Sequence, residues 1–165
     1  MNLVLDASTF LNLINGEVLL KVLKLRGFCF FISKEVRRES KSAAEIISEL
    51  DGCGFFSEID DAIIDVALFE ARVSLWNLGA GEAESIIAAE LLGHSVACDD
   101  LAGRRVAAAQ LGAQRVTGSV GLLRRAVEQE LIAEAEAWEA YRLMRERGGF
   151  LPDLAADYFS IQFQV

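Results

Sequence analysis

The chain has 165 residues, of which 53% are hydrophobic, and this is enough apolar material to bury the core of one domain. Its 25 acidic residues outnumber the 16 Lys and Arg residues, and the net charge of −9 argues against a protein that binds nucleic acid mainly through a broad basic surface. A nuclease is not excluded, because a site built from carboxylates can receive phosphates through bound cations.

The cysteines and the N-terminal segment indicate the compartment. Three cysteines, at positions 29, 53 and 98, form no CxxC pair and leave an odd count, so the sequence predicts neither a zinc site nor a disulfide framework. A strand-like segment follows Met1 directly, without a basic region and a long apolar stretch, so we expect no signal peptide and no membrane span. A reducing cytoplasm is the expected location.

The first half of the chain alternates strand and helix patterns. Residues 2–5 form a short apolar run that ends at Asp6, where a helical pattern begins. Residues 28–32 are five consecutive apolar residues, which predicts a strand buried on both faces. A helix that contains Glu39 is expected after Ser33. Further helices are predicted over residues 18–25, 42–50 and 60–78, with a short extended segment at 55–59.

The second half continues the alternation. Residues 79–100 predict a short helix followed by a buried strand, with Glu82 near the start of the helix and two aspartates closing the strand. Helices are expected over residues 101–111, 120–130 and 132–147, with a strand at 114–117 and a last short helix through 155 and 159. This order predicts an α/β fold with a parallel sheet covered by helices on both sides.

Acidic residues are expected to meet at one edge of this sheet. The carboxyl ends of parallel strands and the starts of the following helices share an edge, which brings together Asp6, Glu82 and the pair at 99 and 100. Glu39 lies about six residues into its helix, roughly 9 Å along the axis, so it needs a tilted helix or its long side chain to join them.

The cluster contains two pairs of neighbouring acids, and the two members of each pair are not equivalent. Neighbouring strand residues point to opposite faces, so Asp99 and Asp100 are expected to differ in role. Glu82 and Glu84 are about 200° apart around their helix, so one of them faces away. The choice within each pair stays open on these grounds.

A cluster of carboxylates needs a counter-charge. Two carboxylates about 5 Å apart repel by roughly 3 kcal/mol at an effective dielectric near 20, so the cluster destabilises the fold or takes up protons unless a cation is bound. Oxygen donors without paired cysteines favour Mg²⁺ or Mn²⁺ over zinc, and such a site suits phosphodiester hydrolysis. His94 sits at the opposite end of its strand from the acids, so we do not expect it to be the catalytic base.

Five motifs in a fixed order resemble those of the PIN-domain family, and the resemblance covers nearly the whole chain. They are Leu-Val-Leu-Asp6-Ala-Ser8, Val36-x-x-Glu39, Leu78-Gly-x-Gly81-Glu82-Ala-Glu84, Asp99-Asp100 followed by Arg104, and Thr117-Gly-Ser119-x-Gly121. The chain is most similar to prokaryotic PIN proteins with GEAE and TGT/S-x-G motifs, which are relatives of the VapC toxins. The C-terminal segment Gly149-Phe150-Leu151 also resembles the C-terminal segment of these proteins.

This resemblance implies a fold, an activity and partners. The fold is a Rossmann-like PIN domain over residues 1–165, with four to five parallel strands and a C-terminal helical extension from about residue 131. The activity is that of a Mg²⁺- or Mn²⁺-dependent endoribonuclease, often the toxin of a type II toxin–antitoxin pair and often a homodimer. RNA and a cognate antitoxin protein are therefore the expected partners, and no membrane is expected.

The resemblance also assigns roles to individual residues. The family's acidic quartet corresponds to Asp6, Glu39, Glu82 and Asp100, and the metal ligands to Asp6, Glu82, Asp100 and Asp99. Glu82 stands where many relatives have aspartate, and its longer side chain changes the expected metal geometry. Residues expected to support the site or to contact the phosphate are Ser8, Glu84, Arg104 and Ser119; helix capping by the serines and a solvated Arg104 are equally open.

Three other functions fit part of the pattern. A PIN-like protein without catalysis would serve as a binding or assembly module, and an active one outside a toxin–antitoxin pair would process RNA. A receiver-like signalling domain also gathers aspartates at strand ends. It would need an acid pair after the first strand and a lysine after the last, whereas Asp6 stands alone and residues 119–121 contain no lysine.

Overall fold

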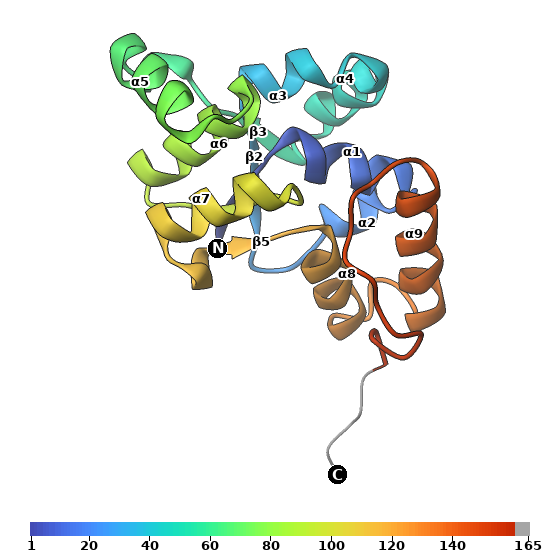
Figure 1. The fold of residues 1–165 in the computed structure, drawn as a ribbon. Helices are drawn as coiled ribbons and strands as arrows, with labels where there is room; N and C mark the ends of the chain where they lie inside the picture. Colours follow the sequence, from blue (N-terminus) through green and yellow to red (C-terminus); the bar gives the residue numbers. More distant parts are fainter. Residues whose placement is uncertain (161–165) are drawn as a thin grey trace.

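A five-stranded parallel sheet forms the centre of the computed structural model, which describes residues 1–160 (Figure 1). The strands are β1 (Asn2–Leu5), β2 (Cys29–Ile32), β3 (Phe56–Glu58), β4 (Ser95–Ala97) and β5 (Val116–Thr117). Their spatial order is β3-β2-β1-β4-β5, and each neighbouring pair is parallel. This confirms the predicted α/β fold, with β1 as the central strand.

Helices cover both faces of the sheet (Figure 1). On one face lie α1 (Ala7–Asn15), α2 (Leu19–Val22), α4 (Ala44–Cys53), α8 (Ser119–Glu128) and α9 (Glu134–Glu146), and Val36 of the short α3 (Lys34–Glu39) packs into the same core. On the other face lie α5 (Val66–Trp76), α6 (Ala80–Leu91) and α7 (Leu101–Leu111). Short 3₁₀ turns, η1 (Lys41–Ala43), η2 (Asp61–Ile63) and η3 (Ala113–Arg115), complete the connections. Within residues 1–160, no helix has the length and apolar character needed to cross a membrane.

Alternation along β1 divides the interior into two cores. Leu3 and Leu5 point into the core on the α1 side, whereas Val4 points into the core on the α6 side. All three side chains are completely buried. The three apolar residues of β1 thus contact a helix layer on each face of the sheet.

Two predicted helices differ from the observed ones. The helix expected over residues 60–78 is interrupted, because Asp65 adopts an extended conformation and its carboxylate accepts a hydrogen bond of 3.0 Å from the Leu68 backbone N–H. Asp65 is therefore the N-cap of α5, which begins as a separate helix after η2. The prediction of a last short helix through residues 155 and 159 is also wrong. The chain there forms turns, in which the backbone N–H groups of Tyr158 and Ser160 donate to carbonyls three residues earlier.

Truncation of a central-strand side chain tests this packing. Leu5→Ala removes buried methyl groups from β1, and the remaining cavity is expected to lower the free energy of unfolding by about 2–5 kcal/mol. Leu75 is 76% exposed on α5, so Leu75→Ala is the matched control and should change that free energy by less than about 0.5 kcal/mol. Urea unfolding followed by circular dichroism measures both. Similar losses in the two variants would contradict the placement of β1.

Candidate metal centre

Asp6 is fixed at the carboxyl end of the central strand. Its backbone N–H donates to the Ala97 carbonyl at 3.0 Å, which extends the pairing of β1 with β4. Its carboxylate begins α1 by accepting the Thr9 backbone N–H at 2.8 Å, and the Ser8 hydroxyl lies 2.9 Å from each carboxylate oxygen. The side chain is only 1% exposed. Asp6 therefore cannot turn away from this edge without breaking the start of α1.

Glu82 faces Asp6 from the first turn of α6. Its Oε2 accepts the Gly79 backbone N–H at 3.2 Å, whereas Oε1 is buried and has no hydrogen-bond partner within residues 1–160. One carboxylate oxygen of Asp6, one of Glu82 and the Cys98 sulfur all lie within 4.8 Å of one another. Three elements, β1, α6 and the end of β4, thus direct ligand-bearing atoms to one point.

Two glycines make room for this cluster. A Cβ atom at Gly103, in the first turn of α7, would lie 2.9 Å from Glu82 Oε1 and 2.7 Å from the Cys98 sulfur. A Cβ atom at Gly81 would lie 2.4 Å from Glu39 Oε2. The bare backbone of Gly81 instead donates its N–H to Glu39 Oε1 at 3.2 Å, which brings Glu39 to the start of α6.

Asp99 and Asp100 occupy different environments. The Asp99 carboxylate accepts the Ser119 backbone N–H and the Asn12 amide, each at 2.8 Å, and it also accepts the Ser119 hydroxyl. Asp100 is exposed, and its Oδ1 accepts the backbone N–H groups of Ala102 and Gly103 at the start of α7. Donors from α1 and α8 thus occupy the partly buried Asp99 carboxylate, whereas Asp100 lies close enough to Glu82 to affect its ionisation.

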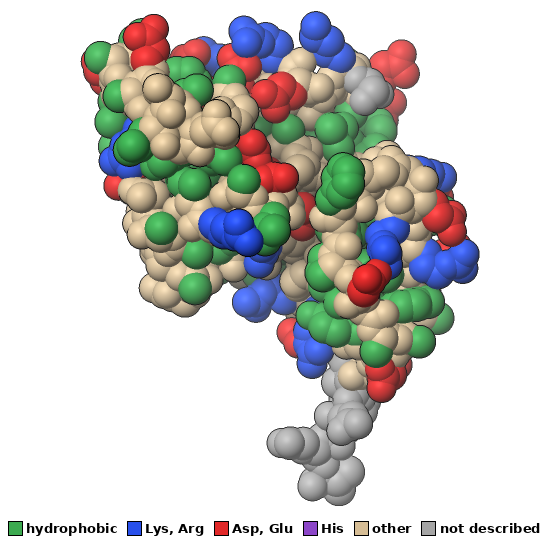
Figure 2. All heavy atoms as spheres, viewed as in Figure 1, with side chains coloured by type: hydrophobic (Ala, Val, Ile, Leu, Met, Phe, Trp, Pro, Cys, Tyr) green, Lys and Arg blue, Asp and Glu red, His purple; other side chains and the backbone are tan. Residues whose placement is uncertain are grey.

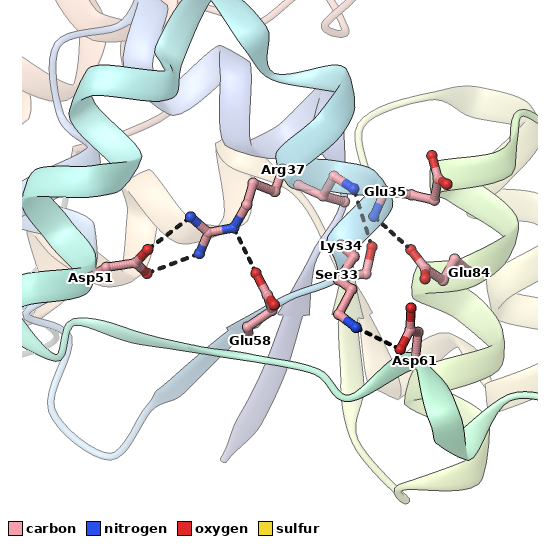
Figure 3. A network of polar contacts seen from close by, with 9 residues as sticks. Ser33, Lys34, Glu35, Arg37, Asp51, Glu58, Asp61 and Glu84 are labelled. Atoms are coloured by element: carbon pink, nitrogen blue, oxygen red, sulfur yellow. Dashed lines mark hydrogen bonds and ion pairs between the residues drawn. The ribbon is translucent and has the colours of Figure 1, made fainter.

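Glu84 points away from the cluster. It is buried against α3, where its Oε2 accepts the Glu35 backbone N–H at 3.0 Å (Figure 3). The same view shows Arg37 paired with Asp51 and Glu58, and Lys34 paired with Asp61 (Figure 3). These two basic side chains of α3 therefore pair with acids of α4, β3 and η2.

Arg104 and Ser8 join the ends of neighbouring strands. Nη1 of Arg104 donates to the carbonyl oxygens of Cys98 at 2.8 Å and Thr117 at 2.7 Å, which links the ends of β4 and β5. Ser8 accepts the Asp99 backbone N–H at 3.1 Å while its own hydroxyl contacts Asp6. Both side chains therefore stabilise the edge on which the carboxylates sit.

Burial dominates the ionisation of the cluster. It raises the pKa of Asp6 from 3.8 to about 6, although hydrogen bonds from Cys98, Thr9 and Ser8 oppose the shift. The pKa of Glu82 is also raised, first by burial and then by the charges of Asp100 and Asp6. Within residues 1–160, no Lys, Arg or His forms an ion pair with Asp6 or Glu82.

The donor set fits a hard divalent cation. Burial, followed by the charge of Asp6, raises the pKa of the Cys98 thiol, so the sulfur stays protonated, and it donates a hydrogen bond to the Asp100 backbone carbonyl at 3.7 Å. The cluster then offers carboxylate oxygens, one of which is buried without a donor. Mg²⁺ and Mn²⁺ prefer such oxygens. Figure 2 shows acidic side chains in the hollow between the α6–α7 side of the molecule and the segment that follows α9.

Comparison with known proteins agrees with this geometry. A family model, DUF3368, described as a PIN domain, matches residues 2–157. The chain belongs to the PIN-domain family. PIN domains are generally metal-dependent nucleases, which is consistent with the acidic cluster of this PIN domain. Searches of curated proteins and of solved structures each found no match.

Two residues at this edge of the PIN domain were missed by sequence reasoning. Cys98 was considered only as a partner for other cysteines, although its place just before Asp99 puts it at the strand end. Asn12 lies on the buried side of α1 beside Leu13, and a polar residue on an apolar helix face is the signal that could have identified it.

The buried Asp6 carboxylate predicts an unusual pH dependence of stability. Its folded pKa of about 6 exceeds 3.8, so without metal the native state binds more protons between these values and stability falls as the pH rises through them. Asp6→Asn keeps an N-cap residue at α1 and removes the charge. In chelator above pH 6, this variant should be more stable than wild type by about 3 kcal/mol, and the gain should vanish near pH 4.

Asp99→Asn is the matched comparison for that experiment. Its carboxylate accepts from Asn12 and Ser119, and an amide nitrogen cannot replace an accepting oxygen. We therefore expect Asp99→Asn to lower the free energy of unfolding by about 1–3 kcal/mol. Urea unfolding of both variants in EDTA from pH 4 to 8 measures the contrast. Destabilisation by both substitutions at pH 7 would contradict the electrostatic assignment of Asp6.

Proposed function

We propose that this PIN domain is a Mg²⁺- or Mn²⁺-dependent endoribonuclease that hydrolyses RNA phosphodiester bonds. The observation that carries the proposal is Glu82 Oε1, a buried carboxylate oxygen without a hydrogen-bond donor in the described chain, beside the buried carboxylate of Asp6. A bound divalent cation offsets the cost of burying these acids together. RNA as the substrate rests on the similarity of the motifs to those of VapC-like proteins.

We assign each residue of the cluster a role from its position, either holding the metal ion or orienting another side chain. A divalent cation, when bound, supplies an activated water and neutralises charge that develops on the phosphate. Asp6 and Glu82 would hold it from β1 and α6, with Asp100 and Glu39 as further carboxylates from α7 and α3. Ser8 keeps the Asp6 carboxylate in one orientation, because its hydroxyl also accepts the Asp99 backbone N–H. Asp99, Ser119 and Arg104 fix the strand ends.

We further propose that the protein acts in the cytoplasm as the toxin of a type II toxin–antitoxin pair and forms a homodimer. The GEAE and TGS-x-G motifs support the toxin role through their similarity to VapC-like proteins. Large exposed apolar side chains, Val66 on α5 and Leu101 on α7, support an interface that a partner covers. A small antitoxin-like reading frame beside the gene would favour this role over RNA processing.

Cleavage assays with paired substitutions test the nuclease. Single-stranded RNA is incubated with Mn²⁺ or Mg²⁺ and wild type, Asp6→Asn, Glu82→Gln or Glu90→Gln. Loss of a supporting residue at a metal site costs about 10- to 100-fold, so loss of a proposed ligand should lower the rate at least that much. Glu90→Gln is the matched control, because Glu90 lies on α6 but is exposed and pairs with Arg72.

Two outcomes would contradict the proposal. Equal cleavage by all four proteins would remove Asp6 and Glu82 from the chemistry. Absence of cleavage by the wild type in both metals, together with binding of RNA or of a protein partner, would instead assign the chain as a binding or assembly module.

A further inference from the structure

Phe150 is an exposed aromatic residue beside the candidate metal centre. Its side chain is 93% exposed, although Leu151 next to it packs against the core. It lines a pocket of about 290 Å³ whose other side is formed by Ser8, Asp99 and Asp100. The pocket therefore runs from the carboxylates to an aromatic ring that no neighbouring element covers.

The backbone that carries Phe150 is held on both sides. The Gly149 N–H donates to the Met144 carbonyl at 2.8 Å, and the Tyr141 hydroxyl donates to the Pro152 carbonyl at 2.7 Å. Gly149 also lies so close to α1 that a Cβ atom there would be 2.5 Å from Asn12 Oδ1. These contacts fix the backbone on both sides of Phe150, so little backbone entropy is lost when the ring binds a ligand.

Arg147 anchors the same segment to the end of α1. Its guanidinium donates to the Asn15 carbonyl at 2.6 Å and to Glu17 at 2.7 Å. The pocket wall thus contains one paired arginine and two aspartates. A phosphate is disfavoured there, whereas a neutral planar group suits a ring flanked by polar side chains.

The size and polar groups of the pocket fit one nucleobase. A volume of about 290 Å³ lies at the lower end of the range for small-ligand pockets, which suits a single base. Bases of single-stranded RNA stack on exposed Phe rings and are read through hydrogen bonds on their edges. Asn15 lines the pocket and carries an amide, whose donor and acceptor match the edge of a base.

We propose that Phe150 and this pocket bind an unpaired RNA base adjacent to the phosphate that is cleaved. The inference rests on the proposed nuclease function and specifies its substrate as single-stranded RNA. The base stacks on Phe150 with its edge toward Asn15, and its sugar–phosphate chain continues toward Asp100 and the carboxylate cluster.

A binding experiment tests the subsite without requiring cleavage. Single-stranded RNA that carries the fluorescent base 2-aminopurine is titrated into Asp6→Asn protein, which also lacks one negative charge at the site. Stacking on Phe150 is expected to quench the fluorescence. Introducing Phe150→Ala into the Asp6→Asn protein should weaken RNA binding by about 5- to 150-fold, the range for one base–aromatic stack. It should also abolish the quenching of the 2-aminopurine fluorescence. Phe150→Tyr should retain both, and Leu75→Ala should change neither.

The outcomes separate this inference from the nuclease. Quenching that is absent, or unchanged by Phe150→Ala, overturns the subsite, even if the otherwise wild-type protein cleaves RNA. Quenching that depends on Phe150 supports the subsite, even if no cleavage is found with either metal. In an active enzyme, Phe150→Ala should raise the KM for RNA and leave the hydrolysis of bis(4-nitrophenyl) phosphate, a phosphodiester without a base, unchanged.

Discussion

The burial of the Asp6 carboxylate is the constraint on which the rest of the site depends. Asp6 ends the central strand and begins α1, so its side chain cannot leave the sheet edge. Burial there disfavours the charged form and raises its pKa to about 6. The fold adds to this cost by bringing Glu82 within 4.8 Å and leaving Glu82 Oε1 without a donor in the described chain. A divalent cation bound between Asp6 and Glu82 would offset the cost of burying Asp6 and would give Glu82 Oε1 a partner.

The acids along this edge are distinguished by the helix starts that they contact. Asp6 begins α1 and Asp100 begins α7, while Asp99 accepts the N–H at the start of α8 and Glu84 one at the start of α3. Glu82 contacts the start of α6 with only one of its oxygens. Helix N-termini attract carboxylates, so the same contacts that order the helices also gather negative charge at one edge.

Local pattern predicted the sheet and its acidic edge, because strand and helix signals depend on residues close in sequence. The interruption at Asp65 was missed, since one acid in a long apolar-faced helix does not by itself indicate a new start. Strand geometry left the choice between Asp99 and Asp100 open, because it depends on distant donors, Asn12 and Ser119, and only the match to the family motif favoured Asp100. The approach of Glu39 likewise depends on the missing side chain of Gly81 on another helix.

A calorimetric titration of Mn²⁺ into the metal-free protein tests the central claim most directly. Wild type is predicted to bind the ion saturably, and the binding should be weakened at least about 10-fold by Glu82→Gln. The Glu90→Gln protein, altered at the other end of α6, should bind as wild type does. Absence of saturable binding by wild type, or equal affinity in all three proteins, would contradict the assignment of Asp6 and Glu82 as a metal site.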